Sequence, residues 1–302
     1  MAFKTSQTVA MVHKVLLLGC GDIAQRLAKN LSAKNLPHCV PQRRYDIVGV
    51  RRTPQKNMQN ICYKSLNARD TAQMQSLLSA HFDVIIMTMT PSENSDEGYR
   101  QGYVEPIQTL LTALAAQTVT IQKKTPTLIV FVSSTAVYGQ DDGSWVNEHS
   151  ITEPKRYNGK RLLEAEALLQ SSAIDSVCVR FSGIYGPGRN HLIKQVRAQQ
   201  WRDTDKTQWS NRIHVDDCAG VLAHLIERHQ AGKTLEPIYL ASDSEPVSRW
   251  HIKQWLAAYL GIIEYEEVSD YNGAMQHKRC SNKLLLESGY VFKYPGYRWG
   301  YR

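Results

Sequence analysis

The sequence predicts an α/β protein built on a doubly wound parallel sheet, with a small C-terminal lobe. Two observations predict this fold class. Short, continuous apolar runs alternate with helical patterns over the first two thirds of the chain, which is typical of strands buried on both faces between helices. In addition, a glycine-rich turn, Gly19-Cys20-Gly21, follows the first apolar run and opens the first helix.

Strands are expected where short apolar runs lack a helical period, and helices where apolar residues recur as at Ile23, Leu27 and Leu31. The expected strands are Val15–Gly19, Asp46–Val50, Ile61–Leu66, Val84–Met89, Leu128–Val132, Val177–Arg180 and a segment near Pro237–Leu240. The expected helices are Ile23–Leu31, Thr71–Ser79, Ile107–Ala116, Lys160–Gln170, Val215–Arg228 and His251–Leu260. After Gly188 the alternation changes, and an aromatic, basic C-terminal part predicts a lobe laid over one end of the sheet.

The glycine-rich turn has the spacing G-x-G-x-x-A. In this context the first glycine allows the tight turn, the second lets the backbone approach a diphosphate, and a small third residue lets helix and strand pack closely. The N–H groups at the helix start then face the phosphates. We therefore expect a dinucleotide to bind at Gly19, Gly21, Asp22, Ile23 and Ala24. An ordinary tight turn is the alternative.

The end of the second expected strand indicates which dinucleotide is bound. An acidic residue there would accept a hydrogen bond from the ribose 2′-hydroxyl of NAD. This chain has Arg51 and Arg52 instead, and no acidic residue follows before Asp70. Because guanidinium groups match the geometry of phosphate, we expect NADP to be preferred over NAD. A solvated basic loop that includes Lys56 is the alternative.

Charge and cysteine content limit the function classes. The net charge of +8 permits a polyanionic partner, but a phosphorylated small molecule explains the excess more economically than DNA. The six cysteines form no Cys-x-x-Cys pair, so neither a metal site nor a disulfide framework is expected. His13 and Lys14 interrupt the first apolar stretch, which is neither a signal peptide nor a membrane span. We expect a cytoplasmic protein with a small-molecule substrate and no nucleic-acid or membrane partner, and leave a homodimer open.

Hydroxyl and basic side chains follow the fifth expected strand. Ser133 and Ser134 come at its end, where open α/β sheets place their chemistry. Tyr157 stands at a helix start, with Lys160 and Arg161 three and four residues later on the same helix face. A nearby cation lowers the pKa of a tyrosine from its usual value of about 10, so the phenol can exchange a proton with an alcohol. The alternatives are serines that only cap the strand and basic residues that only face solvent.

Taken together, these motifs resemble the extended short-chain dehydrogenase/reductases of the NAD-dependent epimerase/dehydratase superfamily. The resemblance runs from about Lys14 to the C-terminus and rests on the glycine turn, on Ser133–Gly139, on Arg180 with Ile184–Gly188, and on Ile213–Asp217. It implies a Rossmann domain, a C-terminal substrate lobe, and hydride transfer to or from a hydroxyl or carbonyl carbon, often of a nucleotide sugar.

The catalytic residues of that family are only partly matched. The resemblance implies that Ser134 supplies the catalytic hydroxyl, and it expects a Tyr-x-x-x-Lys pair. Four residues after Tyr157 stands Arg161, whereas an alignment on the following helix puts Lys160 in the lysine position and Arg156 in the tyrosine position. The chain therefore resembles an atypical branch of the family in which this pair is eroded, and both alignments stay open.

The resemblance also implies a domain division and further cofactor contacts. Residues 1–12 would form a flexible tail, 13–188 with 213–245 the NAD(P)-binding Rossmann domain, and 189–212 with 246–302 the substrate lobe. The further cofactor residues lie mostly at strand ends and are Ser65, Leu66, Thr88, Met89, Thr90, Ser133, Gly183 and Ile184. The leading function is an NAD(P)-dependent oxidoreductase or an epimerase/dehydratase-like enzyme. A catalytically degraded NADP-binding sensor or scaffold is the alternative.

Overall fold

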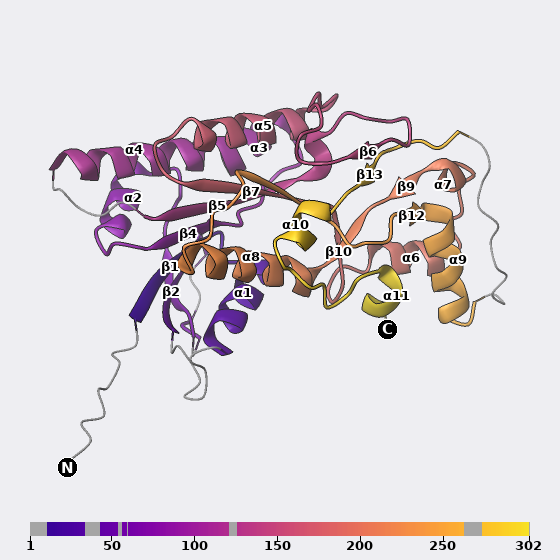
Figure 1. Cartoon of the computed structure of the whole chain (residues 1–302), viewed down its shortest axis with the longest axis horizontal. Coiled ribbons are helices and arrows are strands. Elements are labelled where there is room, and N and C mark those ends of the chain that lie inside the picture. Colours follow the sequence, from indigo (N-terminus) through magenta and orange to yellow (C-terminus); the bar gives the residue numbers. More distant parts are fainter. Residues whose placement is uncertain are drawn as a thin grey trace, which may run out of the picture.

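The computed structural model describes residues 11–33, 43–53, 56–58, 60–120, 126–262 and 274–301. Its centre is a seven-stranded parallel sheet in the order β11-β7-β5-β4-β1-β2-β3 (Figure 1). The strands are β1 (Met11–Leu18), β2 (Arg43–Arg51), β3 (Cys62–Ser65), β4 (Val84–Met87), β5 (Leu128–Ser134), β7 (Ser176–Phe181) and β11 (Ile238–Ala241). The predicted fold class, a doubly wound parallel sheet of the Rossmann type, is confirmed.

Helices cover both faces of this sheet, as Figure 1 shows. One face is covered by α1 (Asp22–Ala33) and α8 (Val215–Gln230), and the other by α2 (Thr71–Leu78), α4 (Glu105–Thr120) and α5 (Tyr157–Gln170). A short helix, α3 (Asp96–Tyr99), and a π-helical turn, η1 (Arg100–Val104), lead directly into α4.

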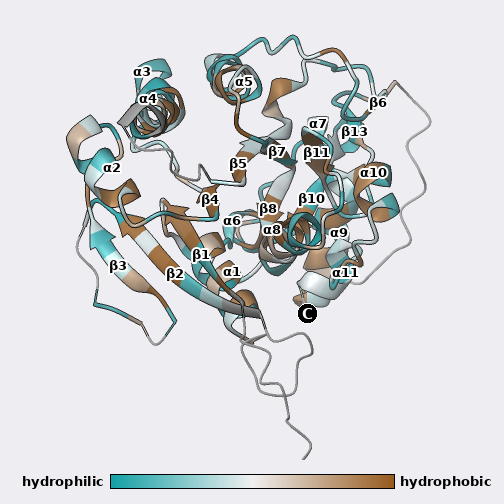
Figure 2. Cartoon of the chain, turned by 60° about the vertical axis from the view of Figure 1, so that its left-hand side comes forward, coloured by the Kyte–Doolittle hydropathy of each residue, from teal (hydrophilic) through white to brown (hydrophobic). Residues whose placement is uncertain are grey.

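The two helix layers explain why the strands are apolar without alternation. In β1, Val15 and Leu17 belong to the core on the α1 and α8 side, whereas Leu16 and Leu18 belong to the opposite core. Successive side chains of a strand point to opposite faces, and here both faces are buried. Figure 2 shows the result as brown, apolar residues along the central strands and teal residues on the outer helix surfaces.

Some element bounds differ from those expected, because hydrogen bonding extends strands beyond their apolar segments. The first strand begins at Met11 rather than Val15, since Met11–Lys14 pairs with residues 43–46 of β2. Met11 and Val12, expected in the tail, therefore belong to the sheet, and residues 1–10 of that tail lie outside the described residues. The helix expected from Lys160 begins three residues earlier, at Tyr157.

The C-terminal part forms a lobe beside the carboxyl ends of the strands, on the right in Figure 1. Its helices are α6 (His191–Arg197), α7 (Thr204–Thr207), α9 (Arg249–Tyr259) and α11 (Tyr297–Gly300), and α10 (Lys283–Glu287) packs beside β11. Short strand pairs are β8 (Gly183–Tyr185) with β10 (Arg212–His214), β9 (Trp209–Ser210) with β12 (Val247–Ser248), and β6 (Trp145–Val146) with β13 (Arg279–Cys280). A separate apolar cluster holds α6, α9 and α11 together through Leu192, Val196, Ile252, Leu256, Ala257 and Tyr297.

One feature of the fold bears on where ligands can bind. The strand order reverses between β1 and β4, and in doubly wound sheets ligands bind in the crevice at the carboxyl ends of such strands. No helix in the described parts of the chain is long and apolar enough to cross a membrane.

Candidate functional site

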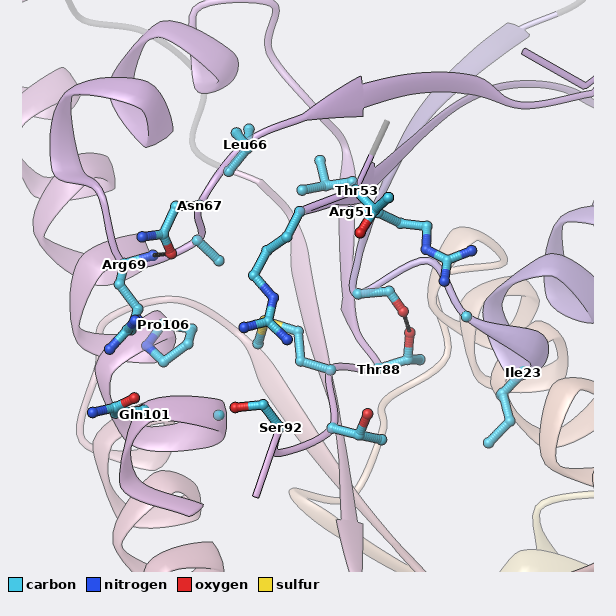
Figure 3. Close-up of a pocket in the computed structure, with 18 of the residues that line it drawn as sticks. Ile23, Arg51, Thr53, Leu66, Asn67, Arg69, Thr88, Ser92, Gln101 and Pro106 are labelled. Carbon is cyan, nitrogen blue, oxygen red and sulfur yellow. Dashed lines mark hydrogen bonds between the residues drawn. The ribbon is translucent and has the colours of Figure 1, made fainter. Parts of the chain in front are cut away.

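A cavity of about 360 Å³ lies at this reversal point, where the loops after β1, β2, β3 and β4 converge. Figure 3 shows Arg51 and Thr53 at the end of β2, Leu66, Asn67 and Arg69 after β3, and Ile23 at the start of α1. The lining residues are Gly19, Gly21, Asp22, Ile23, Val50, Arg51, Arg52, Thr53, Leu66, Asn67, Ala68, Arg69, Thr88, Met89, Thr90, Ser92, Gln101, Gly102, Pro106 and Arg189.

Gly19 is required by the fold itself. Its φ of +79° lies in the left-handed region that favours glycine, and a Cβ there would stand 2.5 Å from the Cα of Met89. The Gly19 amide donates to the Val50 carbonyl at 3.2 Å, and the Thr88 hydroxyl donates to the Gly19 carbonyl at 2.8 Å. The turn is therefore locked between the ends of β2 and β4.

Gly21 is different, because none of the described residues fills the space where its side chain would be. A Cβ at Gly21 would meet no atom closer than the Gly19 carbonyl oxygen, at 3.8 Å. The bare backbone lines the cavity, and the twelve-residue helix α1 begins at the next residue. A glycine without an internal packing reason at a helix N-terminus fits the close approach of a dinucleotide diphosphate.

The end of β2 presents positive charge to the same cavity. Arg51 is half-buried and Arg52 exposed, and both line the cavity. Arg69 also lines it, but its guanidinium is paired with Glu105 at 3.1 Å. Among the described lining residues, the one carboxylate is that of Asp22, the first residue of α1. The region around Arg51 and Arg52 thus suits an anion.

Several residues expected at the cofactor line this cavity, and others lie elsewhere. Ala24 is buried in α1 against the sheet, where its small size allows close packing. Ser65 is exposed, and its hydroxyl donates to the Arg52 carbonyl at 2.9 Å. Gly183 and Ile184 line a second cavity. The cofactor roles of all these residues stay predictions.

Ser133, also expected at the cofactor, belongs to a buried polar network below the end of β5. Ser133 is 4% exposed, and its hydroxyl donates a hydrogen bond to Glu166 of α5 at 2.5 Å. Glu166 in turn accepts from Arg180 of β7 at 2.6 Å, and the same guanidinium donates to the Tyr138 hydroxyl at 2.9 Å. The network ties β5, β7 and α5 together.

The predicted catalytic pair has other partners in this structure. The Tyr157 hydroxyl donates to the Asn94 carbonyl at 2.7 Å. Arg161 binds Asp96 through two hydrogen bonds of 2.8 and 2.7 Å, and these bonds hold the pKa of the Asp96 carboxyl below its usual value. Lys160 is exposed in the first turn of α5. The roles of Tyr157, Lys160 and Arg161 therefore stay predictions.

Ser134 stands where β5 gives way to a short 3₁₀ turn. Its hydroxyl accepts a hydrogen bond from the Ala136 amide at 3.2 Å and so caps that turn. The first turn of α5 packs closely on the same segment, since a Cβ at Gly159 would stand 2.4 Å from the Ala136 carbonyl oxygen. The end of β5 and the start of α5 are thus adjacent, as the expected catalytic arrangement requires.

The second cavity, of about 770 Å³, lies between β8, β10 and the lobe. Arg189, Lys194, Arg212 and Arg249 line it, and its described lining contains no carboxylate. The Arg212 Nε is buried and has no hydrogen-bond partner among the described residues, although its Nη1 donates to Tyr301 at 3.3 Å. A cationic cavity with an unpaired buried donor suits an anionic ligand.

The buried carboxyl of Asp243 lies next to Arg212, since the Asp243 amide donates to the Arg212 carbonyl at 2.6 Å. Asp243 is 1% exposed, and its Oδ2 has no hydrogen-bond partner in the described structure. Burial raises the pKa of Asp243 to about 8, with a smaller opposing effect from the positive charge of Arg212. Burial thus favours the uncharged form of the Asp243 carboxyl. In the described part of the chain, no group of three or more His, Cys, Asp or Glu is arranged to hold a metal ion.

The sequence did not predict a functional role for Arg189, which the structure places at both cavities. Arg189 lines both cavities, and its guanidinium pairs with Asp22 at 2.5 Å. The available signal was its position directly after the Gly186-Pro187-Gly188 turn. That signal does not reveal its partner, which lies 167 residues earlier in the chain.

Comparison with known proteins agrees with this architecture. The family model described as the NAD dependent epimerase/dehydratase family matches residues 28–241. A solved structure of a provisionally named NAD-dependent epimerase/dehydratase from Methylobacillus flagellatus is 32% identical, with a TM-score of 0.79, and the match covers 96% of this chain and 97% of that one. No curated protein matches the chain.

More distant structures share the fold. MoeE5 in complex with UDP-glucuronic acid and NAD is 18% identical with a TM-score of 0.72, over 95% of this chain and 96% of that one. UDP-glucose 4-epimerase from Thermotoga maritima, with UDP-glucose, is 14% identical with a TM-score of 0.69, over 93% and 94% of the two chains. The family match covers most of the chain and includes β4, one of the two strands at the reversal point. The chain therefore belongs to the NAD-dependent epimerase/dehydratase family.

Proposed function

We propose that the protein is an NADP-dependent enzyme of the oxidoreductase or epimerase/dehydratase type. The observation that carries this proposal is the cavity at the reversal point. It joins a glycine turn with a bare backbone at Gly21 to two arginines, Arg51 and Arg52, at the end of β2. When bound there, the nicotinamide cofactor would supply or accept a hydride at a hydroxyl or carbonyl carbon.

The arginines support NADP over NAD. The 2′-phosphate of NADP would lie at the end of β2, where Arg51 and Arg52 line the cavity and no carboxylate of the described lining comes from that strand end. Guanidinium groups bind phosphate through charge-assisted hydrogen bonds, whereas a ribose 2′-hydroxyl gains more from an acidic residue. MoeE5 holds NAD, but its likeness to this chain is one of fold.

The second cavity supports an anionic substrate. Its arginines and lysine match the phosphates of a nucleotide sugar, which is the ligand class that MoeE5 and the Thermotoga maritima epimerase hold. Arg189 lines this cavity as well as the cofactor cavity, so the two are neighbours. In this proposal Ser134 orients the reacting oxygen, and Tyr157 moves a proton with help from Lys160 or Arg161.

Calorimetric titration with NADPH and NADH tests the cofactor assignment. We expect NADPH to bind about 10- to 100-fold more tightly, because a charge-assisted hydrogen bond contributes about 1.5–3 kcal/mol. In the double variant Arg51→Ala/Arg52→Ala, NADPH affinity should fall to that of NADH. Lys56→Ala is the matched control, since Lys56 is an exposed cation after the same strand that does not line the cavity. Equal affinity of the wild type for both dinucleotides would refute NADP specificity.

A second candidate function, an NADP-binding sensor without turnover, is favoured by the pairing of Arg161 with Asp96 and of Tyr157 with Asn94. As an enzyme, the protein would have to free the Tyr157 hydroxyl from the Asn94 carbonyl when substrate binds.

Tyr157→Phe separates the two candidates. We expect this variant to lose at least 100-fold in turnover, in line with removal of a general acid–base group, and to keep its affinity for NADPH. Steady-state oxidation of NADPH against a panel of carbonyl compounds, including nucleotide 4-keto sugars, would measure it. Full activity of Tyr157→Phe would exclude Tyr157 from the mechanism, and absence of turnover in the wild type across the panel would favour the sensor.

A further inference from the structure

We propose that Arg189 reaches from the lobe to bind the diphosphate of the dinucleotide, with Asp22 holding its guanidinium at that position. The proposal rests on the proposed cofactor function and adds a binding residue to it. Arg189 lies outside the glycine turn and comes from the segment that follows β8. It lines the cofactor cavity together with Gly21 and Asp22.

The position of Arg189 is set by its backbone. Gly188, just before it, has a φ of +84°, and the Arg189 amide donates to the Gly186 carbonyl at 3.0 Å. A Cβ at Gly186 would stand 2.6 Å from Nε2 of His214, so the turn is packed firmly against β10. Because the turn is fixed, the side chain extends from a defined point toward α1.

Asp22 then fixes the guanidinium. The Arg189 Nη1 donates to the Asp22 Oδ2 at 2.5 Å, and Asp22 is the first residue of α1, directly after Gly21. The Arg189 side chain is 29% exposed, and its remaining N–H groups have no hydrogen-bond partner among the described residues. A diphosphate seated on the Gly21 backbone would therefore find unpaired donors of a pre-oriented cation beside it.

The charges around Asp22 require such a cation. A carboxylate next to the helix N-terminus would repel a diphosphate unless it were neutralised. Asp22 also accepts from Arg26 at 2.8 Å, but Arg26 is shared with Asp216, which in turn pairs with Lys293 at 3.5 Å. These five side chains carry three positive and two negative charges, so the excess positive charge depends on Arg189.

The test compares two ligands that differ in the diphosphate. NADPH contains it, whereas adenosine 2′-monophosphate keeps the adenosine and the 2′-phosphate but lacks it. We expect Arg189→Met, which keeps the apolar stem, to weaken NADPH binding about 10- to 100-fold and to change 2′-AMP binding less than twofold. Lys194→Met, at a cation that lines only the second cavity, should leave both affinities unchanged. Calorimetry measures all of them.

Three outcomes would overturn the proposal. Arg189→Met could bind NADPH as the wild type does, or it could lose NADPH and 2′-AMP to the same degree, which would indicate a purely structural role. A wild type that binds no dinucleotide would overturn both this proposal and the proposed function. If the wild type instead prefers NADH, only the NADP assignment fails, and the comparison of NADH with adenosine, which lacks the diphosphate, tests Arg189 in the same way.

Discussion

Replacing Glu166 by alanine is expected to lower the free energy of unfolding by about 3–5 kcal/mol, because it leaves a buried guanidinium without its counter-ion. Glu166 and Arg180 are 2% and 3% exposed, and their closest N–O distance is 2.6 Å. The loss also leaves the Ser133 hydroxyl without its acceptor in the interior. Urea denaturation followed by circular dichroism would measure the change.

Two controls separate the loss of a buried charge pair from ordinary truncation. The double variant Glu166→Leu/Arg180→Met removes both charges and should recover much of the lost stability. Glu287→Ala breaks an exposed pair with Lys283 on α10, 3.7 Å apart, and should cost less than about 0.5 kcal/mol. A loss below about 1 kcal/mol for Glu166→Ala would mean that the Arg180 charge finds water or another partner.

The second large effect is expected at the glycine turn, where two neighbouring glycines should respond differently. Gly19→Ala should destabilise the fold by about 2–5 kcal/mol, because it combines a positive φ with a Cβ 2.5 Å from the backbone of Met89. Gly21→Ala should change the free energy of unfolding by less than about 1 kcal/mol, since the nearest described atom that its Cβ would meet is the Gly19 carbonyl oxygen, at 3.8 Å.

Although Gly21→Ala should leave stability nearly unchanged, we expect it to weaken NADPH binding. Its new methyl group would occupy the space that the diphosphate needs, so Gly21→Ala should lose about 10-fold or more in NADPH affinity while folding normally. Thermal denaturation and calorimetry on the same preparations would measure both effects. An unchanged NADPH affinity in Gly21→Ala would show that the diphosphate does not approach this turn.

The fold and the family were predictable because their signals are local. Apolar runs such as Val84–Met87 reflect burial on both faces of a strand, and helical spacing such as Ile23, Leu27 and Leu31 reflects one buried helix face. The G-x-G-x-x-A turn joins the first strand to the first helix within six residues. Each of these patterns depends on neighbours along the chain, so each can be recognised without a structure.

The catalytic pair was less predictable, because its meaning depends on partners. The spacing of Tyr157 and Arg161 predicted a cation beside a phenol on one helix face. In the structure, Arg161 binds Asp96 and Tyr157 binds Asn94, both from the segment after β4. More than sixty residues separate these partners in the sequence, so spacing within α5 says nothing about them.

By itself, the sequence determined the doubly wound sheet, the glycine turn at its first strand, the arginines after its second, and the family to which the chain belongs. Only the tertiary structure decided that Ser133 is buried in an ionic network and that Arg189 pairs with Asp22 between two cavities. It also decided that a side chain at Gly19 would clash with Met89, whereas one at Gly21 would point into open space. The physical reason is that strands, helices and tight turns follow patterns among residues that are close in the sequence. Ion pairs and cavity walls instead depend on where distant segments of the folded chain meet.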